Sequence, residues 1–392
     1  MRITEFKSGI FEKQYKYESF LPVSINRQWK IDSDKIIAKL SEADRIVGAL
    51  SERTKLIPDV DKFIGMHIAK EASQSTKIEG TQTEFAEIFR KKEFIPKERR
   101  NDWQEVQNYI RAINESIAKL EKLPISTKLI CDAHKILLED TKDGHKAPGE
   151  YRKTQNWIGG SSLKDAYYIP PSSEKVSELM ADLEKFVNNK KLNIPELVKI
   201  AIVHYQFETI HPFLDGNGRI GRLLITLSLV SSGLLNKPSL YLSDFFERNR
   251  IDYYDSLTRV RIQNDLENWI IFFLTGIIEV CNNSLDVFDK VLKLKEDIEK
   301  NKIIQLSKPK MINAYKLMEL LYKQPTVKIN DVSNFLNIKF DTAKTLIKDF
   351  VKLKILVDIT SSERKQVFEF SDYLVALTPK HIKEKKKINS RK

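Results

Sequence analysis

The residues with the clearest chemical potential lie between positions 211 and 222, where the chain reads HPFLDGNGRIGR. His211 follows a helical pattern and precedes Pro212, which ends the helix there. Its imidazole is therefore expected at a helix end, where a general base can meet a substrate. His204 lies on the apolar face of the preceding helical pattern and is expected to be a core histidine with satisfied ring nitrogens.

The glycines of this run predict a site for an anion. Gly216, Asn217 and Gly218 stand directly before a second helical pattern, so successive backbone amides and the positive end of that helix can face one ligand. Glycines allow phosphate oxygens to approach the backbone closely. Asp215 beside this loop would repel a phosphate unless a cation intervened, and Mg²⁺ binds through one or two carboxylates together with phosphate oxygens.

Two arginines complete the pattern. Arg219 and Arg222 are three residues apart on the second helical pattern, so both guanidinium groups point the same way. Two parallel donors of this kind suit a polyphosphate. The combination predicts a nucleoside triphosphate, a metal ion and a general base, whereas each feature alone would fit a surface turn between helices.

The elements that must position these residues are mainly helical. Helical periodicity dominates to about residue 300. The segment YRKTQNWIGGSSLKDAYYIPPSS (151–173) is the exception, and its glycines, prolines and aromatic stretches predict a β-hairpin. A polar joint at 301–310 separates this region from a final segment of different character.

The final segment predicts three helices followed by two short strands. The helices are expected at 311–324, 329–338 and 340–356, and this order resembles a winged helix-turn-helix. Its longest helix carries Lys344, Lys348 and Lys352 at intervals of four, which form one exposed stripe. The stripe could contact DNA phosphates, or it could be the solvated face of a protein–protein or dimerisation module.

Composition sets outer limits on function. The chain has 392 residues and a net charge of +12, of which the last thirteen residues supply seven Lys or Arg and one Glu. That tail reads as a disordered, solvated end or as a weak contact for acidic surfaces.

The apolar run WIIFFLTGII (269–278) is too short to span a bilayer and predicts a buried helix segment, so no membrane is expected. Cys131 and Cys281 are the only cysteines, which disfavours disulfides and thiolate zinc sites, and no signal peptide is recognisable. A cytoplasmic location is expected.

HPFLDGNGRIGR resembles the signature of Fic-domain proteins, HxFx(D/E)GNGRxxR, and matches it at every position. SGIFEKQYKYESFLPVSINRQW resembles the leader of bacterial Fic proteins, and GEYRKTQNWIGGSS resembles the segment that leads into their flap. The resemblance implies a Fic-type helical bundle with a β-hairpin flap over the active site. It also implies a protein adenylyltransferase, which moves AMP from ATP to a Ser, Thr or Tyr hydroxyl of a target protein or of itself.

The resemblance assigns a role to each residue of the signature. His211 would take the proton of the hydroxyl, Asp215 would hold Mg²⁺, and Phe213 would anchor the loop. Asn217 would touch the α-phosphate, and the two arginines would hold the β- and γ-phosphates. The implied ATP-binding residues are Gly216, Asn217, Gly218, Arg219, Ile220, Gly221, Arg222, Ser162, Asn249 and Tyr254. Ser162 lies near the expected flap turn, while Asn249 and Tyr254 lie where relatives close over adenine but could equally be a helix start and a core tyrosine.

KEASQSTKIEGTQ (70–82) suggests an inhibitory helix. Ser75 and Glu79 are four residues apart on one helical face, and Gly80 would end the helix. The spacing resembles the family's inhibitory motif, (S/T)xxxE(G/N), in its N-terminal arrangement. A Glu79 carboxylate beside Arg222 would compete with the γ-phosphate for the guanidinium; alone, Glu79 would read as a surface residue at a helix end.

Alternatives in different functional classes remain open. The reverse reaction, removal of AMP from a modified protein, is one, and a DNA-binding regulator whose core senses a nucleotide is another. Transfer of phosphate is disfavoured because Gly218 is present. A homodimer is a further expectation, and the target protein is not readable. The predicted regions are 1–110 (N-terminal helices, with the inhibitory helix at about 62–80), 111–300 (catalytic core, flap at about 155–171), 308–376 (winged-helix-like) and 377–392 (basic tail).

Overall fold

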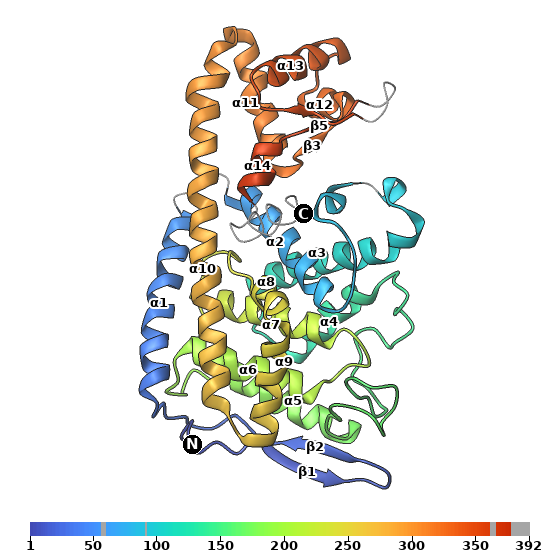
Figure 1. The fold of residues 1–392 in the computed structure, drawn as a ribbon, viewed down its shortest axis with the longest axis vertical. Helices are drawn as coiled ribbons and strands as arrows, with labels where there is room; N and C mark the ends of the chain where they lie inside the picture. The colour runs from blue at the N-terminus through green and yellow to red at the C-terminus, as the bar shows by residue number, and fades with distance from the viewer. Residues whose placement is uncertain (56–59, 91, 361–365, 378–392) are drawn as a thin grey trace, which may run out of the picture. The chain divides into compact units, whose positions relative to one another are not determined.

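The computed structural model describes residues 1–55, 60–90, 92–360 and 366–377. They form two compact units, one of residues 1–54 and 67–281 and one of residues 55–66 and 282–392. The chain is mainly helical, as predicted (Figure 1). Its helices and strands up to α10 are β1 (Gly9–Lys13), β2 (Glu18–Pro22), α1 (Asp34–Lys55), α2 (Val60–Ile78), η1 (Phe85–Phe89), η2 (Lys92–Phe94), η3 (Lys97–Arg99), α3 (Arg100–Leu120), α4 (Thr127–Leu138), α5 (Ser173–Asn188), α6 (Glu196–Ile210), α7 (Asn217–Ser231), α8 (Ser243–Arg248), α9 (Arg250–Gln263) and α10 (Leu266–Asp297).

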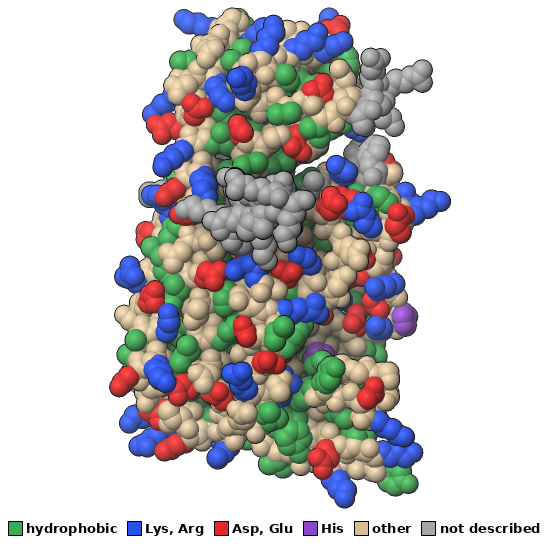
Figure 2. Space-filling view, viewed as in Figure 1, with side chains coloured by type: hydrophobic (Ala, Val, Ile, Leu, Met, Phe, Trp, Pro, Cys, Tyr) green, Lys and Arg blue, Asp and Glu red, His purple; other side chains and the backbone are tan. Residues whose placement is uncertain are grey.

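The centre of the first unit is the pair α6 and α7. Every residue from Leu197 to Ile210 is buried, so α6 is a core helix enclosed on all sides rather than an amphipathic one. It packs against α5 and α7, and α7 also packs against α3 and α4. The loop that carries the signature joins α6 to α7, so two largely buried helices position it. Acidic and basic side chains are interspersed over the visible face of this unit (Figure 2).

An N-terminal hairpin departs from the prediction that residues 1–110 are helical. β1 and β2 pair antiparallel, with Phe11 opposite Phe20. Phe20 is buried and its amide donates to the Ile169 carbonyl, whereas Phe11 is 53% exposed. The connection at residues 14–17 reads QYKY and contains no glycine or asparagine, so the sequence carried no turn signal of the usual kind.

The flap is less regular than the predicted β-hairpin. A single antiparallel bridge joins Ile158 to Tyr168, and the residues between them form turns and bends. Gly160 has φ +68°, and a Cβ there would lie 2.3 Å from the Asp165 carbonyl oxygen. The chain therefore returns antiparallel, as expected, but it closes around a compact turn instead of a strand ladder.

The apolar run at 269–278 lies inside α10. Trp269, Phe273 and Ile277 are fully buried, so the prediction of a buried helix segment is confirmed. The helical stretch around it is longer than the run. Among the described residues, Leu266–Gln305 is the one stretch long and apolar enough by composition to cross a membrane, and 56% of its most apolar window is buried inside the protein.

The second unit contains the three predicted helices and the two predicted strands, together with further elements. Its elements after α10 are η4 (Ile298–Lys302), η5 (Ile303–Gln305), α11 (Lys308–Lys323), β3 (Thr326–Val327), α12 (Ile329–Leu336), α13 (Phe340–Lys352), β4 (Val357–Asp358), β5 (Phe368–Glu369) and α14 (Ser371–Ala376). β3 and α14 were not predicted, and β5 lies between β3 and β4 in a three-stranded sheet. Lys348 and Lys352 are exposed and Lys344 is half-buried on α13. The turn at 361–365 and the tail at 378–392 lie outside the described residues, and DNA contact by the lysines stays a prediction.

Candidate active site

The signature loop is closed by its own side chains. His211 ends α6 with φ 49°, and Gly216 precedes α7 with φ +75°, so both ends of the loop use the left-handed region. The Asn217 side chain spans the loop: its Oδ1 accepts from the Phe213 amide and its Nδ2 donates to the Phe213 carbonyl, both at 2.8 Å. Phe213 is fully buried, in agreement with its predicted role as an anchor.

Two residues that the sequence did not single out tie this loop to the base of the flap. Arg152 donates to the carbonyl oxygens of His211 at 3.0 Å and Pro171 at 2.5 Å. Asn156 donates to the carbonyl oxygens of His211 at 3.2 Å and Phe213 at 2.8 Å. Both precede the flap turn, so the flap and the end of α6 share one hydrogen-bond network. Their position in a stretch of no regular period concealed this role.

His134 supports the loop from α4 and was also missed. Its ring stacks on Phe213, with centroids 3.8 Å apart. Nδ1 accepts from the Gly149 amide at 2.9 Å, so Nε2 carries the hydrogen and donates to the Asp215 carbonyl at 3.0 Å. Burial lowers the pKa of His134 to about 4, which keeps the ring neutral. A lone histidine on an apolar helix gives no signal by which the sequence could reveal this contact.

His211 is neutral near pH 7. Burial lowers its pKa to about 4, an effect that the Glu208 carbonyl offsets only in part. A neutral imidazole at a helix end can accept a proton, as a general base requires. His204, in contrast, is a core residue as predicted, because its nitrogens pair with the Gly221 carbonyl at 3.0 Å and the Tyr253 hydroxyl at 2.8 Å.

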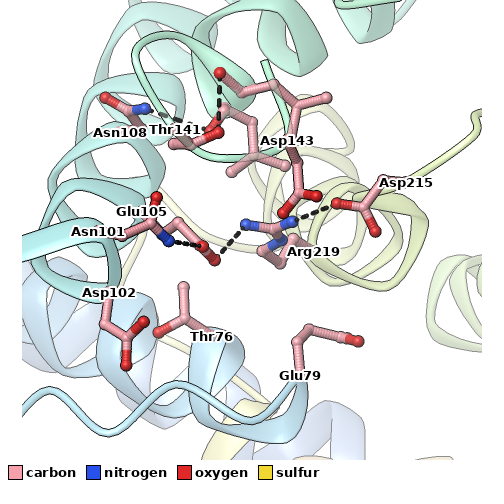
Figure 3. A network of polar contacts seen from close by, with 12 residues as sticks. Thr76, Glu79, Asn101, Asp102, Glu105, Asn108, Thr141, Asp143, Asp215 and Arg219 are labelled. Atoms are coloured by element: carbon pink, nitrogen blue, oxygen red, sulfur yellow. Dashed lines mark hydrogen bonds and ion pairs between the residues drawn. The ribbon is translucent and has the colours of Figure 1, made fainter. Parts of the chain in front are cut away.

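Arg219 lies between two carboxylates (Figure 3). Its Nη1 donates to Glu105 at 2.9 Å and its Nη2 donates to Asp215 at 3.2 Å. Only 3% of the Arg219 side chain and 5% of the Glu105 side chain are exposed. Glu105 also accepts from Asn101 at 2.7 Å. Arg219 therefore joins α3 to the signature loop, a contact that no sequence pattern linked to it.

Asp215 is the residue predicted to hold Mg²⁺. Its side chain is 31% exposed, and Lys146 lies 4.0 Å from Oδ1 while also pairing with Asp143 at 2.7 Å. A half-exposed carboxylate whose neighbours are Arg219 and Lys146 can accept a third cation that brings its own anionic ligands. In the part of the chain that the structure describes, no three His, Cys, Asp or Glu residues could hold a metal by themselves. The donor set therefore fits a magnesium ion shared with phosphate oxygens.

Arg222 is occupied by residues of α2 and the turn that follows it. Its Nε donates to the Ser75 hydroxyl, and its Nη2 donates to the Ser75 carbonyl and to Glu79 Oε1, each at 2.8 Å. The Arg222 side chain is 2% exposed and that of Glu79 is 37% exposed. Burial acts to raise the pKa of Glu79, but Arg222 outweighs it and holds that pKa below its usual value. The predicted pair of Ser75 and Glu79 is thus brought onto one guanidinium.

Gly218 provides the space for this contact. A Cβ at position 218 would lie 2.5 Å from Glu79 Oε1 and 2.9 Å from Arg222 Nη1. The Glu79 carboxylate therefore lies against the backbone of the loop that is predicted to bind the phosphates. Ile220, also among the predicted ATP-binding residues, is buried with 1% of its surface exposed and packs in the core.

The remaining predicted residues lie in three different settings. The Ser162 hydroxyl and amide both donate to Asp165 at 2.7 Å, so Ser162 forms part of the flap turn. Asn249 lies between α8 and α9, and its side chain donates to the Phe245 carbonyl of α8 at 2.9 Å, while it makes no side-chain capping bond to α9. Tyr254 is 39% exposed and thus not a core tyrosine. Burial raises the pKa of Tyr254, and the charge of Glu79 raises it further.

Comparison with known proteins defines the class to which this site belongs. Residues 124–229 match the Fic/DOC family, and residues 37–118 match the N-terminal region of the same family. Two solved structures share the fold. A Fic family protein from Desulfovibrio desulfuricans aligns with a TM-score of 0.53 at 20% identity over 88% of this chain and 98% of its own. Fic-1 from C. elegans aligns with a TM-score of 0.51 at 22% identity over 66% and 74%.

Curated relatives agree with this class. The chain is 36% identical over 195 residues to a probable protein adenylyltransferase of Aquifex aeolicus, covering 47% of this chain and 57% of the relative. It is 32% identical over 168 residues to the protein adenylyltransferase Fic of Aedes aegypti, covering 42% and 29%. The corresponding protein of Drosophila grimshawi is 30% identical over 183 residues, covering 46% and 33%. The matches thus span 29–57% of these relatives' lengths. The part of the chain that carries the signature and the helices before it is therefore similar to proteins of the Fic/DOC family.

Proposed function

We propose that this protein transfers AMP from ATP to a hydroxyl group of a target protein, and that Glu79 inhibits the transfer. The observation that carries the proposal is the intact loop between His211 and Arg222, with a neutral imidazole at one end and a buried guanidinium at the other. The names of the curated relatives support the same activity. ATP is the substrate, and Asp215 is the residue that would hold Mg²⁺.

The residues of the loop divide the work. His211 takes the proton of the acceptor hydroxyl as the hydroxyl oxygen bonds to the α-phosphorus. The bond from that phosphorus to the bridging oxygen breaks, and pyrophosphate leaves. The amides at 216–218 and the guanidinium of Arg222 bind and orient the phosphates, which accounts for catalysis by positioning and electrostatics. A bound magnesium ion would neutralise part of the phosphate charge.

The proposed inhibition follows from the ion pair between Glu79 and Arg222. Glu79 Oε1 holds the guanidinium at 2.8 Å and lies against Gly218, so a γ-phosphate cannot take the same position. ATP would bind with its tail displaced and its α-phosphate out of line with the acceptor. A misplacement of about 1 Å can lower the rate by on the order of 10²-fold.

The test uses ATP labelled at the α- or the γ-phosphate. Glu79→Gly protein is expected to label itself and proteins of a cell lysate with the α label, the wild type much less, and Glu79→Gly/His211→Ala not at all. Label from the γ position alone would mean phosphorylation and would contradict the proposal. Equal labelling by wild type and Glu79→Gly would contradict the inhibitory role of Glu79.

Removal of AMP is a second candidate because the Glu79 carboxylate is 37% exposed beside the loop. From that position it could orient a water molecule toward a bound AMP-protein bond. Incubation of wild-type protein with an AMP-modified target separates the two functions: release of AMP that Glu79→Gln abolishes supports removal, while no release leaves transfer as the activity.

A further inference from the structure

Glu208 is a buried carboxylate that the mechanism above does not use. It lies on α6 one turn before His211, and its Oε2 is 4.0 Å from Nδ1 of His211. The residue is 7% exposed, and among the described residues its Oε1 has no hydrogen-bond partner. A buried carboxylate with an unpaired oxygen is costly to the folded state, so its presence beside the base calls for an explanation.

Gly221 makes room for this carboxylate. A Cβ at position 221 would lie 2.1 Å from Glu208 Oε1 and 3.2 Å from a ring carbon of Phe207. α7 can therefore close on α6 at this point only because position 221 has no side chain. Gly221 is among the predicted ATP-binding residues; in the structure its α-carbon faces Glu208, and its carbonyl pairs with His204 at 3.0 Å.

We propose that Glu208 is a positioning residue for His211, whose carboxylate stabilises the imidazolium formed when the base takes a proton. The catalytic meaning of this inference rests on the function proposed above. The proton of the acceptor hydroxyl moves to Nε2, and the resulting positive charge extends to Nδ1, which lies 4.0 Å from Glu208 Oε2. A carboxylate at about 4 Å favours the charged form of an imidazole. The imidazolium later returns its proton to solvent.

Charges from four segments act on this pair. Arg222 of α7 and Arg261 of α9 favour the ionised form of Glu208, and Arg261 and Arg152 disfavour a positive charge on His211. Glu79 disfavours the ionised form of Glu208 and favours a positive charge on His211. Burial raises the pKa of Glu208 to about 7, so the carboxylate changes charge in the range where such an enzyme works. Ionisation of Glu208 is therefore expected to be visible at the His211 ring.

The first test needs no catalytic activity. In the full-length protein with ¹⁵N-labelled histidine rings, the His211 signals, assigned by their loss in His211→Ala, are expected to move with a midpoint near pH 7. Glu208→Gln should remove this step. Glu71→Gln is the matched control, since Glu71 is also buried, has its pKa raised to about 7 by burial, and pairs with Ser243 instead of a histidine. Absence of the step in wild type, or its persistence in Glu208→Gln, would overturn the inference.

The second test measures AMP transfer in the Glu79→Gly background. Glu208→Gln is expected to lower kcat by roughly tenfold, with little change in KM for ATP, and to abolish the rise in rate through pH 7. Gly221→Ala, which displaces the carboxylate without removing it, should lose the same rise and serves as a second variant if Glu208→Gln does not fold. An unchanged profile in both variants contradicts the inference. Failure of Glu79→Gly to transfer label, with the ring titration as expected, would refute the proposed function and leave the pairing of Glu208 with His211 supported.

Discussion

Arg219 and Arg222 lie one turn apart on α7, but the carboxylate that pairs with Arg219 is buried, whereas the one that pairs with Arg222 is partly exposed. Arg219 pairs at 2.9 Å with Glu105, whose side chain is 5% exposed, and Arg222 pairs at 2.8 Å with Glu79, whose side chain is 37% exposed. The distances are alike, so the difference lies in the surroundings. Loss of the Glu105 contact would remove an ion pair that is buried on both sides and leave Arg219 with Asp215 alone, whereas Glu79 can return to water. One arginine thus holds the helices together, and the other is available to exchange its partner for a phosphate.

The largest effect expected from this difference is on stability. Glu105→Ala should lower the free energy of unfolding by about 3–5 kcal/mol, because it removes the buried partner of Arg219 and leaves only the partly exposed Asp215. Glu79→Ala should lower it by about 1 kcal/mol or less, as is usual for a partly exposed pair. Urea denaturation of the two variants and the wild type measures both. Equal losses of unfolding free energy in Glu105→Ala and Glu79→Ala would contradict the distinction between a buried and a partly exposed ion pair.

Activity should show the reverse ranking. Glu79→Gln, which keeps the size of the side chain and removes its charge, is expected to raise self-labelling from α-labelled ATP by on the order of 10²-fold. Glu105→Gln should not raise it, since Glu105 does not contact Arg222. An increase in Glu105→Gln comparable to that in Glu79→Gln would mean that Arg219 is also part of the inhibitory contact.

Ser75 gives a smaller and more specific effect. Its hydroxyl accepts from Arg222 Nε, while its carbonyl accepts from Nη2 and would remain in Ser75→Ala. Loss of one hydrogen bond to a charged group should weaken the hold on the guanidinium and raise self-labelling by roughly tenfold or less. Ser73→Ala, at a buried serine of the same helix, is the control and should leave labelling unchanged. Activation as large as that of Glu79→Gln would assign the inhibition to the hydroxyl.

The smallest effect concerns pH, and its sign differs between the two pairs. Arg222 keeps the pKa of Glu79 low, so this pair stabilises fully above the unfolded-state value of about 4.3 and weakens only as pH falls through the lower folded-state value. Burial raises the pKa of Glu105 despite Arg219, so the wild type should gain stability relative to Glu105→Gln as pH falls toward that unfolded value. Unfolding of wild type, Glu79→Gln and Glu105→Gln between pH 7 and 5 measures this. A constant difference for Glu105→Gln would contradict it.

The sequence predicted those parts of the site whose residues are close together along the chain. His211 at a helix end, the glycine loop and the position of Phe213 all follow from a single run of residues. Ser75 and Glu79 were predicted because a second motif, far from the first, has its own recognisable spacing. Glu105 had no such spacing, and its contact with Arg219 arises only when α3 packs on α7.

The fold was predicted less evenly. Helices with long periodic patterns were found, but the β1–β2 hairpin was missed because its turn has neither glycine nor asparagine. The flap was expected as a hairpin because glycines and aromatic residues are typical of one. In the structure, Asp165 accepts hydrogen bonds from Ser161 and Ser162, and these side-chain bonds replace the strand ladder. Whether a backbone amide donates to a nearby side chain or to a neighbouring strand depends on the local geometry, which the amino-acid composition does not reveal.

The close approach of Gly218 and Glu79 bears on how the proposed inhibition could be relieved. Any side chain at position 218 would push the carboxylate away, since even a Cβ would lie 2.5 Å from Oε1. If the phosphates bind against this backbone as proposed, the same side chain would also take up space that they need. Under the proposed inhibition, a change in the turn that carries Glu79 would release Arg222 without altering the loop of residues 211–222.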